Sequence, residues 1–353
     1  MESSSNSDTI AQNSQETIQD RSQQSAEHYR VLWYTLDGDT TKANEILAER
    51  GSSNEIELVA AQHEAYVPPT PDQLAGCDAI VNERCAIRGQ TVEDCANAGI
   101  RLVASMSIGI NHIDVDRLAK KGITVSNCPG YCAEEVATHA MALMLDLERE
   151  ITFSNRNVLA GKWAPKVDYP IHRLSSQTLG LVFFGHIAQA VVPIARGLGM
   201  RVFVWAPTKS AEEVAQAGCE KVNTLEELLS RSDVVSLHCP LVAETRGLIG
   251  AHELELMGPD SFLINTARGE CVNEEALADA LEAGTIRAAG IDTLAHEVDN
   301  QNMRLVDNPR CVITPHVAFD SEEAAATQRR MALEACIEFL VQGRYPEHTV
   351  YPK

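Results

Sequence analysis

Short apolar runs alternate with amphipathic stretches along the chain from residue 30 onward. The apolar runs are RVLWYTL, IELVAA, DAIVN, IRLVASM and ITVSN. The stretches between them carry apolar residues at helical spacing, and two of them (TVEDCANAG and DVDRLAKKG) end in glycine, as helix C-termini often do. Strands that alternate with helices in this way predict a parallel sheet covered by helices on both faces.

The pattern breaks at CPGY (128–131) and then begins again. Val136, Ala140 and Leu143 fall on one face of AEEVATHAMALMLDLERE, which predicts a long helix. A second series of apolar runs follows, made of TLGLVFF, MRVFVW, DVVSLH, SFLINT, AAGID and CVITPH. The chain is therefore predicted to be α/β, with two doubly wound parallel-sheet domains. We expect residues 29–128 and 315–353 to form one domain, because the C-terminal helix returns to it, and residues 129–314 to form the other.

Composition narrows the class of protein. Residues 1–28 are rich in Ser, Gln and Asn and have almost nothing to bury, so a disordered tail is expected. The formal net charge is −21, which would repel phosphate backbones and anionic lipid, so neither nucleic acid nor a membrane is an expected partner. The sequence shows neither an apolar run of about 20 residues nor a signal peptide, and we expect a cytoplasmic protein.

Ten cysteines are dispersed along the chain, and no C-x-x-C occurs among them. This spacing does not predict a metal site. Reduced, mostly buried thiols are the expected state of such cysteines in a cytosolic protein.

The run TLGLVFF leads directly into FGHIAQAVVPIARGLG, as a strand leads into a helix at a dinucleotide-binding turn. In the G-x-G-x-x-G/A pattern Gly185 takes the second position, Ala188 the third, and Phe183 replaces the first glycine. We expect Gly185, His186 and Ile187 to contact the cofactor. An ordinary strand–turn–helix without a ligand explains this segment equally well.

The next strand ends at Ala206, where an acid usually binds the ribose 2′-hydroxyl. Without that acid a 2′-phosphate is not repelled, and Thr208 and Lys209 could bind it. The cofactor is therefore expected to be NADP or NAD, with NADP slightly favoured. Lys209 is equally explained as an exposed loop lysine.

Four segments together resemble the D-isomer-specific 2-hydroxyacid dehydrogenase family. They are SIGINHIDVDRLAKKGITVSNCPGY, LHCPLVAETRGLI, LINTARGECVNEEALADAL and VITPHVAF, and the resemblance covers about residues 100–340. It implies a Rossmann-type cofactor domain and a flavodoxin-like substrate domain with a cleft between them, in a homodimer. It also implies an oxidoreductase that transfers a hydride between the nicotinamide and a small 2-oxo or (2R)-hydroxy acid.

The resemblance also implies roles for individual residues. Arg268 matches the arginine that binds the substrate carboxylate, His316 the general acid/base, and Glu297 the acid that pairs with this histidine. The positions that match the cofactor site are Cys239, Pro240, Thr266, Ala267, Arg268, Asp292 and His316. The positions expected to bind substrate are Ile108, Gly109, Arg268, His316 and Phe319.

Some positions depart from the family pattern, so other functions stay open. Phe183 in the turn, His186 in place of an arginine, and altered residues around Asn111 put cofactor and substrate identity in doubt. A dinucleotide-sensing protein that resembles a transcriptional corepressor is the alternative to an enzyme. Formate oxidation is disfavoured, because formate dehydrogenases that resemble this family have Gln where Glu297 stands. Phosphite oxidation is not excluded.

Overall fold

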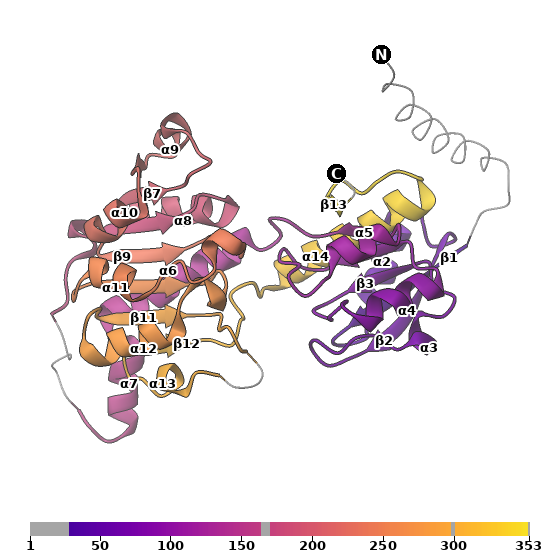
Figure 1. Ribbon diagram of the computed structural model, residues 1–353. Helices are drawn as coiled ribbons and strands as arrows, with labels where there is room; N and C mark the ends of the chain where they lie inside the picture. The colour runs from indigo at the N-terminus through magenta and orange to yellow at the C-terminus, as the bar shows by residue number, and fades with distance from the viewer. Residues whose placement is uncertain (1–27, 164–169, 298–300, 352–353) are drawn as a thin grey trace, which may run out of the picture. The chain divides into compact units, whose positions relative to one another are not determined.

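The computed structural model describes residues 28–163, 170–297 and 301–351 (Figure 1). The chain divides into two compact units: unit 1 is Met1–Tyr131 with Ala325–Lys353, and unit 2 is Cys132–Ala324. The tail expected over residues 1–28 lies outside the described residues, apart from its last position. The second boundary falls after the one expected near Pro315, because the segment that follows Pro315 is hydrogen-bonded to unit 2.

Unit 1 contains a six-stranded sheet in the order β13-β5-β4-β3-β1-β2. Read from the β2 edge, its first five strands have the 2-1-3-4-5 order of flavodoxin-like folds. All neighbouring strands are parallel except β13, which pairs antiparallel with β5 and was not expected from the sequence. The strands are β1 (Tyr29–Thr35), β2 (Ile56–Gln62), β3 (Ala79–Asn82), β4 (Leu102–Ser105), β5 (Thr124–Ser126) and β13 (Thr349–Tyr351).

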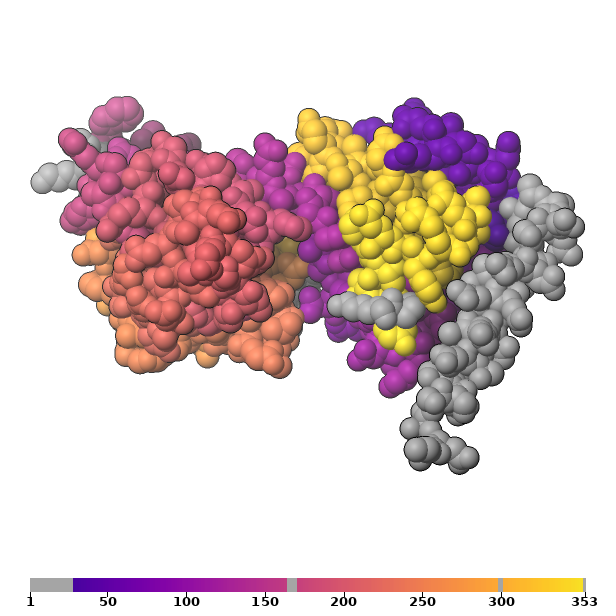
Figure 2. All heavy atoms as spheres, turned by 90° about the horizontal axis from the view of Figure 1, so that it is seen from above, coloured from indigo at the N-terminus to yellow at the C-terminus, as the bar shows by residue number. Residues whose placement is uncertain are grey.

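The C-terminal helix completes the core of unit 1. Leu333 and Leu340 are buried against Trp33 of β1 and Leu47 of the first helix, and Figure 2 shows this yellow segment against the indigo one. This is why residues from the end of the chain belong to the first domain. The helices are α2 (Thr41–Glu49), α3 (Pro71–Leu74), α4 (Gln90–Ala98), α5 (Val115–Lys120) and α14 (Glu322–Cys336), which continues as a π-helical turn, η4 (Ile337–Val341).

Unit 2 contains a seven-stranded sheet in the order β12-β11-β10-β9-β6-β7-β8. Its strands are parallel, and the order reverses between β6 and β9, as in Rossmann folds, so the predicted fold class is confirmed. The strands are β6 (Thr178–Val182), β7 (Arg201–Trp205), β8 (Glu220–Lys221), β9 (Val234–Leu237), β10 (Phe262–Asn265), β11 (Ala288–Ile291) and β12 (Cys311–Ile313).

Helices cover both faces of the second sheet. One face packs against α6 (Ala133–Arg149) and α8 (His186–Gly197), and the other against α10 (Leu225–Arg231), α11 (Ala251–Met257) and α12 (Glu274–Ala283). The remaining elements are α7 (Ile151–Leu159), η1 (Leu174–Ser176), α9 (Ala211–Gln216), η2 (Ala243–Thr245), η3 (Gly269–Cys271) and α13 (Met303–Val306). Within the described ranges, none of the helices is both long and apolar enough to cross a bilayer.

Candidate functional site

The turn between β6 and α8 has the geometry of a dinucleotide-binding turn. Phe183 has φ +71°, in the left-handed region that normally requires glycine. This conformation explains why the first position of the G-x-G-x-x-G/A pattern is usually glycine. The Phe183 ring packs edge-on against Trp205, with the centroids 5.6 Å apart, and its backbone N–H donates to the Trp205 carbonyl. The left-handed conformation costs a non-glycine residue about 1–2 kcal/mol, and these contacts hold it in place.

The start of α8 leaves room for a ligand. Gly185 is the N-cap and gives the first turn no side-chain cap, and no atom lies within 4 Å of the point where its Cβ would be. Ala188 is fully buried, as close packing of helix and strand requires. Gly185 and His186 are exposed and Ile187 is half-buried. Free backbone N–H groups beside open space suit a pyrophosphate.

At the end of β7, acidic and basic side chains meet where the ribose is expected. Ala206 is buried and contributes no carboxylate, whereas Thr208 is exposed. Lys209 Nζ lies 3.0 Å from Glu213 Oε1, and the other oxygen of Glu213 accepts from the Ser210 N–H. These two bonds hold the pKa of Glu213 below its usual range. Lys209 is thus engaged by an acid that the sequence argument overlooked.

The Arg268 turn is fixed by a buried asparagine at the end of β10. Asn265 accepts from the Ala267 N–H at 3.0 Å and donates to the Arg268 carbonyl at 2.9 Å. Thr266 and Ala267 are buried, and the Thr266 hydroxyl has no hydrogen-bond partner among the described residues, so it remains available to a ligand. Arg268 itself is half-buried, and one of its Nη atoms donates to the Ala267 carbonyl.

Gly269 brings this turn against the loop that leads to Glu297. A Cβ on Gly269 would lie 2.0 Å from the Leu294 carbonyl carbon and 2.1 Å from the Ala295 nitrogen, closer than any real contact. Any side chain at position 269 would therefore collide with the backbone of the neighbouring loop, whereas the φ of Gly269 itself does not require glycine. Neither Asn265 nor Gly269 was singled out from the sequence, although both lie in the INTARG motif.

His316 and Glu297 are brought together as expected. Nδ1 of His316 lies 2.7 Å from Oε1 of Glu297, and each side chain is 25% exposed. The Phe319 ring is edge-on to the His316 ring, with the centroids 6.3 Å apart. The imidazole is thus held on one side by a carboxylate, and its Nε2 atom is the one left for a proton transfer.

Asp292 organises the loop that carries His316. Its carboxylate is 1% exposed and accepts from the Thr314 hydroxyl at 2.6 Å and from the backbone N–H groups of Val317 and Ala318 at 3.1 and 3.0 Å. His316 has φ +53°, and its N–H donates to the Asp292 carbonyl. The sequence placed Asp292 beside the nicotinamide, but its hydrogen bonds are made to this loop.

His139 extends the same network from α6. Its Nε2 lies 2.9 Å from the Thr314 hydroxyl oxygen. Because that hydroxyl donates its one hydrogen to Asp292, it accepts from His139, which must therefore carry a proton on Nε2. The contact joins residues 175 positions apart, so no pattern within one segment of the sequence could have predicted it.

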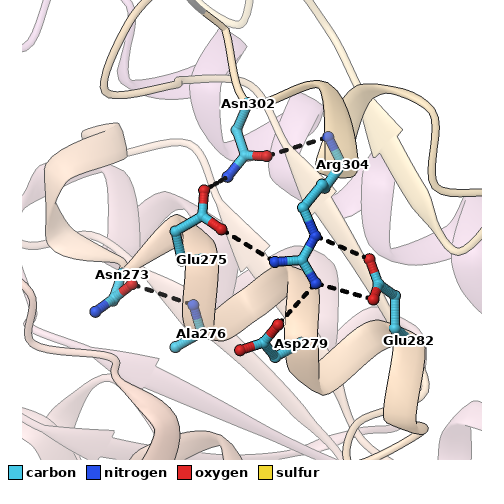
Figure 3. Close-up of polar contacts among 7 residues, drawn as sticks. All are labelled: Asn273, Glu275, Ala276, Asp279, Glu282, Asn302 and Arg304. Carbon is cyan, nitrogen blue, oxygen red and sulfur yellow. Dashed lines mark hydrogen bonds and ion pairs between the residues drawn. The ribbon is translucent and has the colours of Figure 1, made fainter.

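Asn302 and Arg304 anchor their part of the chain on α12 (Figure 3). The Gln301 side chain donates to the Glu297 carbonyl at 2.8 Å. Arg304 then contacts three acids, which raise the pKa of its guanidinium. These acids are Glu275, Asp279 and Glu282, and Asn302 donates to the first of them.

The remaining expected residues lie in two places. Cys239 and Pro240 follow β9, and Cys239 is buried. Ile108 and Gly109 belong to unit 1, where the Asn127 amide donates to the Ile108 carbonyl and the Ser107 hydroxyl to the Gly109 carbonyl, both at 2.9 Å. Across the described residues, no group of three or more His, Cys, Asp or Glu side chains is arranged to hold a metal ion.

Comparison with known proteins identifies the family. Residues 141–318 match the model of the D-isomer specific 2-hydroxyacid dehydrogenase NAD binding domain. The chain is 34% identical over 316 residues to a glyoxylate reductase from Korarchaeum cryptofilum, covering 86% of this chain and 93% of that one. It is 32% identical over 273 residues to a hydroxypyruvate reductase from Blautia hydrogenotrophica, covering 76% and 84%.

A solved structure agrees over nearly its whole length. The TT0316 protein from Thermus thermophilus superposes with a TM-score of 0.78 at 30% identity, covering 91% of this chain and 99% of that one. The chain therefore belongs to the D-isomer specific 2-hydroxyacid dehydrogenases, oxidoreductases that bind a nicotinamide dinucleotide and act on the CH–OH group of 2-hydroxy acids.

Proposed function

We propose that this enzyme reduces a small 2-oxo acid to the (2R)-hydroxy acid, with His316 as the proton donor. The observation that carries the proposal is the 2.7 Å contact between His316 and Glu297. The Glu297 carboxylate fixes the Nδ1 side of the imidazole, so that Nε2 can present a proton to the carbonyl oxygen of the substrate. In the reverse direction the same neutral nitrogen accepts the proton of the hydroxy acid.

Arg268 is proposed to bind the substrate carboxylate. Its planar guanidinium has donors spaced for two carboxylate oxygens, and Asn265 and Gly269 fix the turn that carries it. A bound nicotinamide supplies the hydride that reaches the carbonyl carbon. The protein's task is then to position the carboxylate at Arg268 and the carbonyl oxygen near His316, since positioning accounts for much of such catalysis.

Glyoxylate and hydroxypyruvate are the proposed substrates. The curated relatives named above are reductases of these acids, and the chain covers most of their length. Both acids carry the carboxylate and adjacent carbonyl that an arginine and a histidine recognise. The Phe319 ring beside His316 would limit the room for a larger side chain.

For the cofactor, we propose a modest preference for NADPH. The support is the missing acid at Ala206 together with the nearby Lys209. Glu213 works against this preference, because it pairs with Lys209 and would repel a 2′-phosphate. E213Q should therefore shift the ratio of kcat/KM values toward NADPH, and K209A should shift it toward NADH. The exposed neighbour Glu212 provides the control, since E212Q should leave the ratio unchanged.

The activity is tested by following nicotinamide absorbance with glyoxylate, hydroxypyruvate and larger 2-oxo acids. H316Q should lower kcat by about 100-fold or more, as loss of a general acid usually does. R268A should mainly raise KM for the 2-oxo acid, by about 10- to 100-fold for a lost charged hydrogen-bond pair. The controls H252Q and R246A remove a surface histidine and a surface arginine of the same unit. Turnover that survives H316Q, or a wild-type chain that binds nucleotide without turnover, would refute the proposal and favour a dinucleotide sensor.

The homodimer and the cytoplasmic location stay predictions. Helix α7 has no buried residue in the isolated chain and exposes Ile151, Val158 and Leu159 by 58%, 48% and 80%. This apolar surface supports an association between copies. Light scattering after gel filtration tests it, and a monomer at micromolar concentration would contradict it.

A further inference from the structure

Two cysteines that are far apart in the sequence meet beside the Arg268 turn. Cys239 lies shortly after β9, and Cys271 is the last residue of η3, which follows β10. Strands β9 and β10 are parallel neighbours, so the segments that leave their carboxyl ends lie side by side. Topology thereby places two thiols together that are separated by 32 positions.

The two sulfur atoms are in direct contact. They lie 3.5 Å apart, with the Cys239 thiol donating to the Cys271 sulfur, and the residues are 3% and 0% exposed. The hydrogen bond lowers the pKa of Cys271, and it raises that of Cys239 together with burial. Cys271 is thus the more acidic thiol, and Cys239 is the proton donor beside it.

We propose that Cys239 and Cys271 form a reversible redox site that a hydroperoxide oxidises to a disulfide. Local opening of the turn admits the small peroxide to these buried sulfur atoms. The Cys271 thiolate then attacks the peroxide oxygen, the O–O bond breaks, and a sulfenic acid forms with release of water or alcohol. The Cys239 sulfur then displaces the sulfenic oxygen, which leaves as water, and the S–S bond forms. Two thiols lose two electrons and two protons, the peroxide is reduced, and an added dithiol reverses the change.

The disulfide would disturb the Arg268 turn. A disulfide is about 2.05 Å long, so the sulfur atoms must approach each other by about 1.5 Å. The Cys271 N–H donates to the Arg268 carbonyl at 3.1 Å, which ties any movement of Cys271 to the arginine. This consequence rests on the proposed function of Arg268. A displacement of about 1 Å in a positioning group can lower the rate by about 100-fold, and we expect a fall of this order in kcat/KM for the 2-oxo acid.

The experiment uses the full-length protein, reduced and then treated with hydrogen peroxide. Peptide mapping by mass spectrometry should find the Cys239 and Cys271 peptides joined, with the loss of two hydrogen atoms. The fall in kcat/KM should follow the joined fraction and reverse with dithiothreitol. C271V, which keeps an apolar side chain in this buried position, should turn over like the reduced protein and keep its activity in peroxide.

Another buried cysteine of the same unit, outside the pair, gives the matched control. C311V should lose and regain activity as the wild type does, because Cys311 lies on β12 and is not part of the pair. The redox site is refuted if peroxide joins no Cys239 and Cys271 peptides, or if the joined protein keeps full activity. Failure of the proposed function is distinguishable, because the reduced protein would then show no turnover before any peroxide is added.

Discussion

Replacing Asp292 with asparagine tests how the His316 loop is held. The side chain is 1% exposed, so water cannot substitute for a lost contact. Oδ1 accepts from the Thr314 hydroxyl and the Val317 N–H, and Oδ2 accepts from the Ala318 N–H. Asparagine keeps the shape but turns one oxygen into an NH2 group. The orientation that costs least keeps Oδ1 and sets the new NH2 group against the Ala318 N–H.

The cost follows from these contacts. One hydrogen bond to a charged group is worth about 1.5–3 kcal/mol, and a buried N–H without a partner costs about 1–3 kcal/mol. Because the two remaining bonds also lose their charge, and the burial of a charge is relieved, we expect a net loss of about 3 kcal/mol in the free energy of unfolding. The left-handed His316 is then free to relax, and a shift of about 1 Å would lower kcat by about 100-fold.

Thermal unfolding and steady-state kinetics measure the two effects on the same samples. The dissociation constant for the nicotinamide cofactor, from fluorescence titration, should change little, because the carboxylate contacts the loop. D307N removes an exposed aspartate of the same unit and should leave all three quantities unchanged. The reasoning is refuted if D292N unfolds and turns over like the wild type. A large loss of cofactor affinity with an intact kcat would instead assign the carboxylate to the cofactor.

Substitutions at three further positions test other parts of unit 2. Burial raises the pKa of Glu148 to about 7, whereas the unfolded chain ionises it near 4.5, so stability from this group is lost as the pH rises between these values. The free energy of unfolding of E148Q should therefore exceed that of the wild type by about 3 kcal/mol at pH 8 and by little at pH 4, as measured by urea unfolding. E255Q, at an exposed position, is the control, and the same pH dependence in E148Q and the wild type would contradict the prediction. Alanine usually gives a more stable protein than glycine, but the positive φ at position 183 favours glycine, so the free energy of unfolding of F183G should exceed that of F183A by about 1–2 kcal/mol. Equal stability of the two variants would argue against strain at this position. H139F should lower kcat about tenfold by leaving the Thr314 hydroxyl without its donor, and H139Q should recover most of it; equal losses in both variants would indicate that His139 only fills space.

Local sequence was sufficient for most of the elements, although not for β13, and for the order of the motifs. The alternation of apolar and amphipathic segments reflects which face of each strand or helix is buried, a property of neighbouring residues. It predicted two parallel sheets, and the motifs identified Arg268, Glu297 and His316, of which the last two lie in contact. The sequence also showed that Phe183 replaces the first glycine of the G-x-G-x-x-G/A pattern, because that pattern requires a particular backbone conformation at this position.

Tertiary structure alone decided which side chains support the site. His139 reaches Thr314 across 175 residues, and Cys239 meets Cys271 across 32, because α6 and the ends of parallel strands are brought together by the fold. Gly269 is required by backbone that arrives from another loop. Such contacts depend on strand order and loop path, which no periodicity within a segment encodes. The sequence by itself thus determined the family and led to the proposed reacting groups, and packing between distant segments determined how those groups are held.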